Sequence, residues 1–338
     1  MTHPERLAAF VRLGQRLRTL SDDELHALAA RARNHNAWFD LPNVRSAVAG
    51  VAHLLEEDTL TRWAAHYPAE PAAAPRRVGV VMAGNIPMVG FHDLLCVLLS
   101  GHTLLAKLSA DDNILLRWVA DELLRIEPRF ANRLQFVELL READAFIATG
   151  SDNTARYFEY YFSKKPHLIR RNRSSLGVLA GLEPREDLAA FGADIFQYYG
   201  LGCRNVSKLL VPAGYDFTPL LDSLQPWAHV LDHHRYNNNY DYQKSLLLVN
   251  RVPHFDSGFL LLTESMQLVS PISVLHYSEY ADAADLEQQL AEVAPQTQCV
   301  VSVNGWLAGS VPAGKAQQPS VGDYADGVDT MAFLTALA

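Results

Sequence analysis

Residues 77–87 read RVGVVMAGNIP, a short valine-rich run that ends in a small-residue turn with an asparagine and a proline. Such a run is typical of a strand buried on both faces, as in a parallel sheet. Residues 89–99 follow it and predict a helix from their apolar spacing. This order of strand, turn and helix begins an α/β region, and it places the turn at the carboxyl end of a strand.

The alternation of strands and helices continues from this stretch through most of the chain. Up to residue 186 the pattern predicts further strands at 103–108, 134–139 and 145–149 and helices at 114–126 and 154–162. Beyond it the pattern predicts helices at 189–199, 220–231 and 284–293, and strands at 208–211, 245–250, 259–263, 272–277 and 299–303. Alternating buried strands and helices indicate an α/β fold, a parallel sheet with helices on both faces. Its ligand site is expected at the carboxyl ends of the strands.

The two ends of the chain differ from this pattern. Up to about residue 66 the apolar residues recur at helical spacing, and a linker rich in proline and alanine follows at 68–75. Near the other end, the apolar run 330–334 predicts a strand that joins a sheet, either within its own domain or at a subunit interface. We therefore expect four parts: a helical segment with a linker at 1–75, α/β domains at 76–186 and 187–305, and a tail at 306–338.

Composition excludes several classes of protein. The chain has 338 residues, of which 49% are hydrophobic and 20% charged, with a formal net charge of -9. These values exclude disorder for most of the chain and disfavour a nucleic-acid binder, which usually needs a basic face. No apolar run approaches the ~20 residues that span a bilayer, and the N-terminus lacks the pattern of a signal peptide. With three cysteines and no CxxC motif, a cytoplasmic protein is expected.

The three cysteines lie in different settings. Cys96 in LLCVLLS and Cys299 in QCVVSV lie in apolar runs, and we expect both to be buried and inert. Cys203 lies in YGLGCRN, with glycines before it and Arg204 after it. Glycine allows a ligand to approach the backbone closely, and a neighbouring cation favours the nucleophilic thiolate. Cys203 is the candidate nucleophile, although a turn cysteine beside glycine usually has no chemical role.

Three further turns follow expected strands. Asn85 in AGNIP can direct its amide into a cleft, and Lys107 and Ser109 in AKLS could bind ribose hydroxyls or a phosphate. The ATGS turn at 148–151 precedes a helix, whose N-terminus favours an anion. Each turn alone is equally compatible with a plain connection between a strand and a helix.

Taken in order, these elements resemble the aldehyde dehydrogenase superfamily, and most closely its LuxC-type acyl-CoA reductases. The resemblance covers roughly residues 77–337. It is carried by VMAGNIP (81–87), ATGS (148–151), GLGCRN (200–205), LDHHRYNNNYDYQKS (231–245) and DYADGVDTMAFL (323–334). It implies an aldehyde-dehydrogenase-like fold, with a Rossmann-like cofactor domain at 76–186 and a second α/β domain, the catalytic one, at 187–305.

The resemblance also implies roles for the matched residues. Cys203 would attack the substrate carbonyl, and the Asn85 amide and the Cys203 N–H would stabilise the oxyanion. The cofactor would be NADPH, with NADH as an alternative, held by Lys107, Ser109, Thr149, Gly150 and Ser151. The family glutamate that contacts the nicotinamide ribose has no assigned counterpart, because Gln267 stands at the aligned position and Glu264 lies three residues earlier.

One departure from the superfamily bears on the reaction. Hydrolytic aldehyde dehydrogenases carry a glutamate that activates water, whereas residues 168–177, LIRRNRSSLG, contain no acid. An acyl-enzyme on Cys203 should therefore persist until CoA or a hydride reaches it. The implied activity is reduction of an acyl-CoA or acyl-carrier thioester to an aldehyde. The alternatives are a CoA-acylating aldehyde dehydrogenase that works in the oxidative direction and a non-catalytic scaffold that keeps the fold.

Three remaining features are interpreted without a role in the chemistry. No metal site is expected at His229, His233 and His234, because adjacent histidines are poor partners and no other ligand completes the set. The basic run 170–173 is expected to be solvated, or else to meet the phosphates of CoA or an acidic carrier protein. The apolar tail favours a homo-oligomer.

Overall fold

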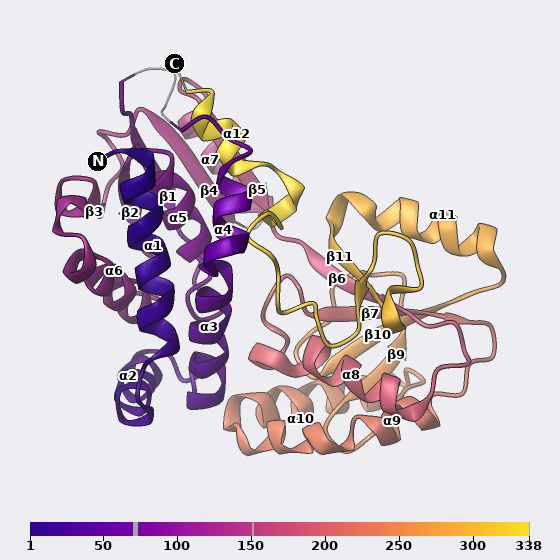
Figure 1. Cartoon of the computed structure of the whole chain (residues 1–338). Coiled ribbons are helices and arrows are strands. Elements are labelled where there is room, and N and C mark those ends of the chain that lie inside the picture. The colour runs from indigo at the N-terminus through magenta and orange to yellow at the C-terminus, as the bar shows by residue number, and fades with distance from the viewer. Residues whose placement is uncertain (70–73, 151, 338) are drawn as a thin grey trace. The chain divides into compact units, whose positions relative to one another are not determined.

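The computed structural model describes residues 1–69, 74–150 and 152–337 (Figure 1). The chain divides into two compact units, residues 1–172 with 319–338 and residues 173–318. These bounds differ from the four expected parts. The helical N-terminal segment belongs to the first unit, the boundary between the α/β units lies at Asn172 and Arg173, and the last residues return to the first unit.

The first unit is built on a five-stranded parallel sheet in the order β3-β2-β1-β4-β5. The strands are β1 (Arg77–Val81), β2 (Thr103–Lys107), β3 (Leu134–Phe136), β4 (Ala145–Gly150) and β5 (His167–Arg171). Val81 pairs with Lys107 on one side and with Ala148 on the other, so the central strands end nearly level. The strand order reverses between β1 and β4, and this topological switch point is where ligands of such sheets bind.

Among its described residues, the first unit also contains eight α-helices. They are α1 (His3–Arg18), α2 (Asp22–His35), α3 (Leu41–Leu54), α4 (Glu57–Ala64), α5 (Phe91–Leu99), α6 (Ile114–Ile126), α7 (Asp152–Phe162) and α12 (Thr330–Thr335). α1 packs against α3, α5 and α6 (Figure 1). Its buried Arg6 donates from Nε to the Leu99 carbonyl at the end of α5, at 2.9 Å. The N-terminal helices are thus part of the sheet's covering layer.

The second unit has a seven-stranded sheet in the order β12-β11-β6-β7-β10-β9-β8. The strands are β6 (Ser174–Val178), β7 (Val206–Pro212), β8 (Phe255–Asp256), β9 (Leu261–Glu264), β10 (Val274–Tyr280), β11 (Thr297–Ser302) and β12 (Val311–Pro312). All pair in parallel except β8, which is antiparallel to β9. The predicted α/β class with parallel sheets is confirmed.

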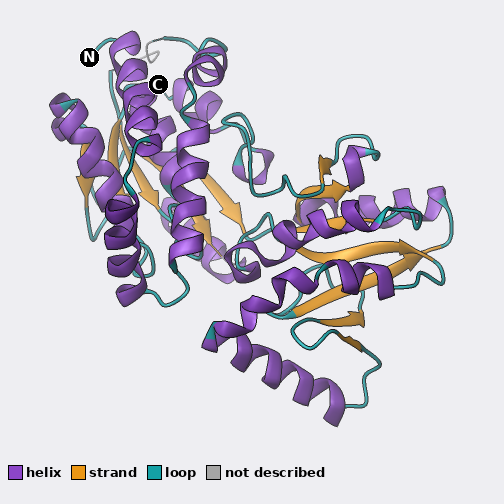
Figure 2. Cartoon of the chain, turned by 60° about the horizontal axis from the view of Figure 1, so that its bottom comes forward, coloured by secondary structure: helices purple, strands orange, loops and turns teal. Residues whose placement is uncertain are grey.

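Helices cover both faces of this second sheet, as Figure 2 shows. They are α8 (Arg185–Phe196), α9 (Thr218–Ser223), α10 (His234–Val249) and α11 (Ala283–Val293). Along β6, Leu176 and Val178 form a core cluster with Leu286 of α11. Gly177 between them faces Phe191 of α8, which a Cβ would approach to 2.8 Å. Successive residues of a strand point to opposite faces, so α8 and α11 cover different sides.

Two segments predicted as strands are helical, and four strands of the described residues were not predicted: β5, β6 and the two-residue strands β8 and β12. Residues 245–250 continue α10, because a leucine-rich run that favours neither state by periodicity extends a helix already begun at His234. Residues 330–334 lie in α12, where Asp329 caps the helix by accepting from the Ala332 N–H at 2.8 Å. Strands β5 and β6 contain arginines and serines, so their sequences are not the apolar runs that predict a buried strand.

The C-terminal segment is bound to its own first unit. α12 packs against α5, and Met331, Leu334 and Leu337 are buried. Just before it, the Tyr324 hydroxyl accepts from Trp63 Nε1 at 3.1 Å and lies 2.7 Å from the Tyr67 hydroxyl. Because its apolar side chains are covered within the chain, the segment gives no support to a subunit interface. This agrees with the alternative that it joins its own domain.

Arg170 belongs to the interior and not to a solvated basic face. Its side chain is 3% exposed, and Nη1 lies 2.9 Å from both carboxylate oxygens of Asp93 on α5. Nη2 donates to Thr330 Oγ1 on α12 at 2.5 Å. Arg170 therefore joins β5, α5 and α12, and neither reading of the basic run at 170–173 applies to it. Its neighbour Arg171 is exposed and pairs with Glu159 at 2.9 Å.

Replacing Arg170 by alanine should strongly destabilise the first unit, because Asp93 would remain buried without its counter-charge. We expect a loss of roughly 3 kcal/mol or more in the free energy of unfolding. Arg171→Ala is the matched control, since it removes an exposed ion pair and should change the value by less than about 1 kcal/mol. Urea denaturation of the full chain measures both. Equal, small effects of the two substitutions would contradict a central role for the buried pair.

Candidate functional site

The oxyanion candidate Asn85 and the described cofactor candidates lie at the carboxyl edge of the first sheet. The strands keep their register to this edge, since the Met82 N–H donates to the Lys107 carbonyl at 3.0 Å. Asn85 follows β1 and is exposed, and Lys107, also exposed, is the last residue of β2. Thr149 and Gly150 end β4 and are partly exposed. Ser151 lies outside the described residues. The topology thus gathers four of these residues beside the switch point.

The loop that carries Asn85 packs closely on the loop after β2. A Cβ on Gly84 would lie 2.5 Å from Ser109 Cβ and 3.1 Å from the Asp112 N atom, so only glycine fits there. Ser109 Oγ accepts from the Asp111 N–H at 3.2 Å. The structure therefore gives Ser109 a role in shaping its own loop, and contact with a cofactor remains a proposal for it.

Asp112 makes the second contact between these two loops. Its side chain is buried, and Oδ2 accepts from the Met88 N–H at 2.6 Å, whereas Oδ1 has no hydrogen-bond partner. Met88 has a φ of 58°, in the left-handed region that a non-glycine residue rarely adopts. Burial raises the pKa of Asp112 to about 7, against the opposing effect of the Met88 N–H. Asp112 could not be recognised from the sequence, since a polar Asp-Asp pair before a helix suggests only a cap.

The turn after β4 is held close to α7. A Cβ on Gly150 would lie 3.0 Å from the Thr154 side chain and 3.2 Å from the Phe158 ring. Helix α7 begins at Asp152, directly after this turn. The N-terminus of α7 therefore lies at the carboxyl edge of the sheet, as an anion-binding turn requires.

In the second unit, the loop that carries Cys203 is anchored by one buried amide. Asn205 Oδ1 accepts from the Gly202 N–H at 2.8 Å. Its Nδ2 donates to the carbonyls of Asp194 at 3.0 Å and Gln197 at 2.9 Å, where α8 ends. Asn205 is 2% exposed. The Cys203 loop is thereby fixed to the end of a helix, while Cys203 itself remains partly exposed.

The chain enters this loop through strained backbone. Tyr198 and Tyr199 have φ values of 54° and 57°, and Gly200 has 77°. Two consecutive non-glycine residues in the left-handed region cost free energy, and such strain persists only where the surroundings enforce it. The Tyr199 ring lies 4.5 Å from the His233 ring. Strain next to a candidate nucleophile is a common property of functional loops.

Ser175, on β6, supports Cys203 from the neighbouring strand. Its hydroxyl donates to the Cys203 carbonyl at 3.0 Å and lies 3.1 Å from Cys299 Sγ. Cys299 is only partly buried, which corrects the prediction that it lies in the core. The register between β11 and β6 shifts between Thr297 and Val300, on either side of it. Cys96 is buried as predicted, and burial raises the pKa of its thiol.

The acid-free stretch 168–177 forms most of β5 and β6 and their connection. The two candidates for the ribose contact, Glu264 and Gln267, are both exposed, at the end of β9 and just after it. The Gln267 carbonyl lies 3.1 Å from His276 Nδ1, which holds its backbone to β10. Neither residue is singled out by these contacts.

In the described part of the chain, no group of three or more His, Cys, Asp or Glu side chains is placed to bind a metal ion. Buried His233 stacks with His234 at 5.3 Å between ring centres. Among the described residues, no helix has the length and apolarity that crossing a membrane requires.

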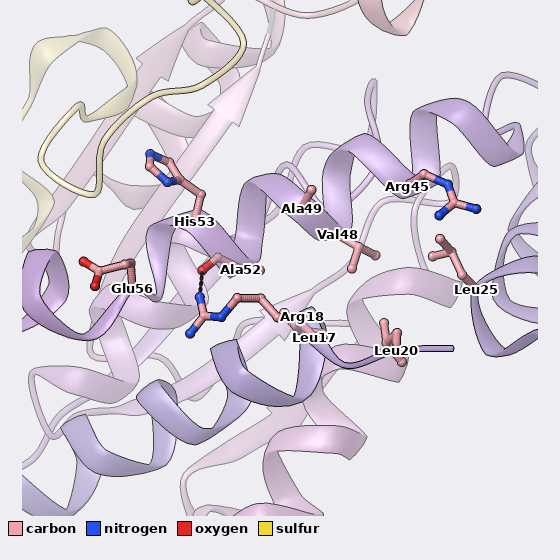
Figure 3. A pocket seen from close by; sticks show the side chains of 10 residues that line it. All are labelled: Leu17, Arg18, Leu20, Leu25, Arg45, Val48, Ala49, Ala52, His53 and Glu56. Atoms are coloured by element: carbon pink, nitrogen blue, oxygen red, sulfur yellow. Dashed lines mark hydrogen bonds between the residues drawn. The ribbon is translucent and has the colours of Figure 1, made fainter. Parts of the chain in front are cut away.

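A pocket of about 520 Å³ lies among α1, α2 and α3 of the first unit (Figure 3). Its wall is mainly apolar, with Leu17, Leu25 and Val48 among the lining residues. Its two arginines already have partners, because Arg18 donates to the Ala52 carbonyl and Arg45 to Asp22. None of the candidate catalytic or cofactor residues lines it, so it is not the candidate active site.

No family model and no curated protein sequence matches the chain at a significant level. Solved structures do match its fold. An indole-3-acetaldehyde dehydrogenase in complex with NAD+ is 15% identical, with a TM-score of 0.67 over 94% of this chain and 75% of the other. The aldehyde dehydrogenase KauB from Pseudomonas aeruginosa is 15% identical, with a TM-score of 0.64 over 91% and 73%. An NAD+ complex of a Mycobacterium tuberculosis aldehyde dehydrogenase is 14% identical, with a TM-score of 0.62 over 89% and 73%.

The chain therefore has an aldehyde-dehydrogenase-like fold, as the order of motifs predicted. At these identities the likeness concerns the fold, and the chemistry has to be argued from the residues themselves.

The buried carboxyl of Asp112 should make stability depend on pH. Its pKa is about 7 in the folded chain and 3.8 as an ordinary value, so between these values the folded state holds a proton that the unfolded state has lost. The free energy of unfolding should then fall as pH rises through this window, by up to about 1.4 kcal/mol per pH unit. Asp112→Asn removes the titration and should flatten this part of the profile.

Thermal or urea unfolding of the wild type and Asp112→Asn between pH 5 and 8 measures this difference. Asp111→Asn is the control, because Asp111 is the exposed neighbour and its replacement should leave the slope unchanged. Parallel profiles for the wild type and Asp112→Asn would show that the Asp112 carboxyl does not titrate in this range.

Proposed function

We propose that this protein is an NAD(P)H-dependent acyl-CoA reductase that converts an acyl-CoA, or an acyl group on a carrier, into an aldehyde through an S-acyl-cysteine. The observation that carries the proposal is the Cys203 loop, which is anchored by Asn205 and strained at Tyr198 and Tyr199, and in which Cys203 is partly exposed. This loop occurs on an aldehyde-dehydrogenase-like fold. The resemblance to LuxC-type enzymes adds the substrate class.

The nucleophile in this proposal is the Cys203 thiolate, which attacks the thioester carbonyl and displaces the CoA thiolate. The Asn85 amide and the Cys203 N–H donate to the oxyanion that forms. Cys203 keeps the acyl group until a hydride adds to its carbonyl carbon. The resulting thiohemiacetal then collapses to the aldehyde and frees the thiolate, and the expelled CoA thiolate takes up a proton.

A reduced nicotinamide cofactor would supply the hydride when bound. The carboxyl edge of the first sheet fits such a group, since helix α7 begins there next to the partly exposed Thr149 and Gly150, and the exposed Lys107 offers a cation. Lys107, Ser109, Thr149, Gly150 and Ser151 are the proposed binding residues. NADPH is proposed first because of the LuxC resemblance. NADH is the alternative, and two of the structural neighbours described above are NAD+ complexes.

The fate of the acyl group is inferred from residues 168–177. They contain no carboxylate that could activate water, so the acyl group is transferred to a hydride or to CoA and not hydrolysed. A CoA-acylating aldehyde dehydrogenase that works oxidatively would use the same residues, and rates in the two directions separate these functions. A non-catalytic scaffold would have no reason to retain the strained backbone before Cys203. A cytoplasmic homo-oligomer remains part of the proposal.

Cys203→Ala should abolish oxidation of NADPH with acyl-CoA, because no covalent intermediate can form. Cys299→Ala is the matched control, a partly buried thiol that contacts the same serine, and it should retain most of the activity. Activity is followed at 340 nm, the absorbance of reduced nicotinamide, with NADPH and NADH and acyl-CoAs of graded length. Undiminished turnover in Cys203→Ala would refute the mechanism.

Without a reduced cofactor, the wild type should accumulate an acyl group on Cys203 and release free acid only slowly. Intact-protein mass spectrometry after mixing with acyl-CoA measures the added mass, and peptide mapping assigns it to Cys203. Cys203→Ala serves as the blank. Rapid formation of free acid with no acylated protein at steady state would indicate a hydrolytic enzyme instead.

A further inference from the structure

Asp112 is a buried carboxylate to which the proposed reaction gives no role. It is 1% exposed and lies in the loop between β2 and α6, two residues before the helix begins. One oxygen accepts a hydrogen bond of 2.6 Å from the Met88 N–H, and the Leu115 N–H in the first turn of α6 also stabilises the charged form, whereas Oδ1 makes no regular hydrogen bond. A buried charge that is only half satisfied is costly, so its place in the structure calls for an explanation.

Asp112 accepts its hydrogen bond from Met88, the residue that ends the turn carrying Asn85. Met88 follows Asn85, Ile86 and Pro87, and its carbonyl accepts from the Phe91 N–H at 2.9 Å where α5 starts. Its left-handed backbone, with φ of 58°, is unfavourable for methionine and reverses the chain between the turn and the helix. The hydrogen bond that the Met88 N–H donates to Asp112 favours this left-handed conformation over the common backbone conformations of methionine.

The other end of the turn is fixed to the same loop. Gly84 packs against Ser109 and the backbone of Asp112 without room for a Cβ. Asn85 is therefore held on both sides, at Gly84 by close packing and at Met88 by the carboxylate. Asn85 itself remains exposed. An exposed amide on a turn fixed at both ends is preorganised to donate a hydrogen bond.

We propose that Asp112 is the residue that positions Asn85, by holding the Met88 turn in its left-handed form. This inference rests on the proposed function for the part that concerns the reaction. A donor that is displaced by a fraction of an ångström loses much of its effect on an oxyanion, because stabilisation depends on preorganised geometry. Asp112 acts through the turn and touches neither substrate nor cofactor.

Three variants test this role in the full-length protein. Asp112→Ala removes the acceptor, Asp112→Asn keeps an oxygen that can accept from the Met88 N–H, and Asp111→Ala removes the exposed neighbour as a control. Asp112→Ser, whose hydroxyl is too short to reach Met88, replaces the alanine variant if that variant fails to fold. Two measurements are made: the rate of acylation of Cys203 by acyl-CoA without cofactor, and amide hydrogen exchange at Met88.

We expect Asp112→Ala to slow acylation by about tenfold or more, with little change in the dissociation constant of NADPH. Exchange at the Met88 amide should become faster. Asp112→Asn should recover acylation to within about threefold of the wild type, and Asp111→Ala should match the wild type. This combination separates positioning from a general loss of structure, which would weaken NADPH binding as well and would not be rescued by asparagine.

The contrary outcomes are distinct. Wild-type acylation and exchange in Asp112→Ala would overturn the inference, as would equal losses of acylation and of NADPH affinity that asparagine fails to restore. If the wild type itself forms no acyl-enzyme, the proposed function fails, and exchange alone then decides the role of Asp112. In that case faster exchange at Met88 in the alanine variant, but not in the asparagine variant, supports the holding of the turn, and unchanged exchange overturns it.

Discussion

The buried ion pair between Arg170 and Asp93 is the constraint on which the first unit depends. It joins the edge strand β5 to α5, and through Thr330 it joins both to α12. A charge pair with side chains 3% and 10% exposed has little water to replace a lost partner, so each member fixes the place of the other. Nη2 of the same guanidinium donates to the Thr330 hydroxyl, so the pair also fixes the start of α12 beside β5 and α5.

Each unit presents its candidate loop in the same physical manner. Asn85 is exposed and Cys203 is partly exposed, and each of their loops is fixed by one buried polar side chain, Asp112 or Asn205. Both also contain non-glycine residues in left-handed conformations, at Met88 and at Tyr198 and Tyr199. Non-glycine residues rarely adopt this conformation, and such exceptions are concentrated at functional sites.

The sequence predicted those features that depend on local pattern. The valine-rich strand at 77–81 and the helix at 114–126 follow from periodicity and turn residues, and the order of motifs indicated the fold. The prediction was wrong for residues 330–334, because apolar residues spaced by three were interpreted as alternation and the cap at Asp329 was overlooked. Asp112, Ser175 and Asn205 could not be identified, since their importance comes from partners that folding brings to them. For Ser175 and Cys299 these partners lie 124 residues apart.

The return of residues 319–337 to the first unit makes the second unit an insertion within the first. During synthesis the second unit, a continuous segment, is complete before the first unit can be. The face of α5 against which α12 packs stays uncovered until residues 330–335 have been synthesised and have left the ribosome. A nascent chain therefore carries this open apolar surface while the whole of the second unit is being synthesised, and α12 covers it afterwards.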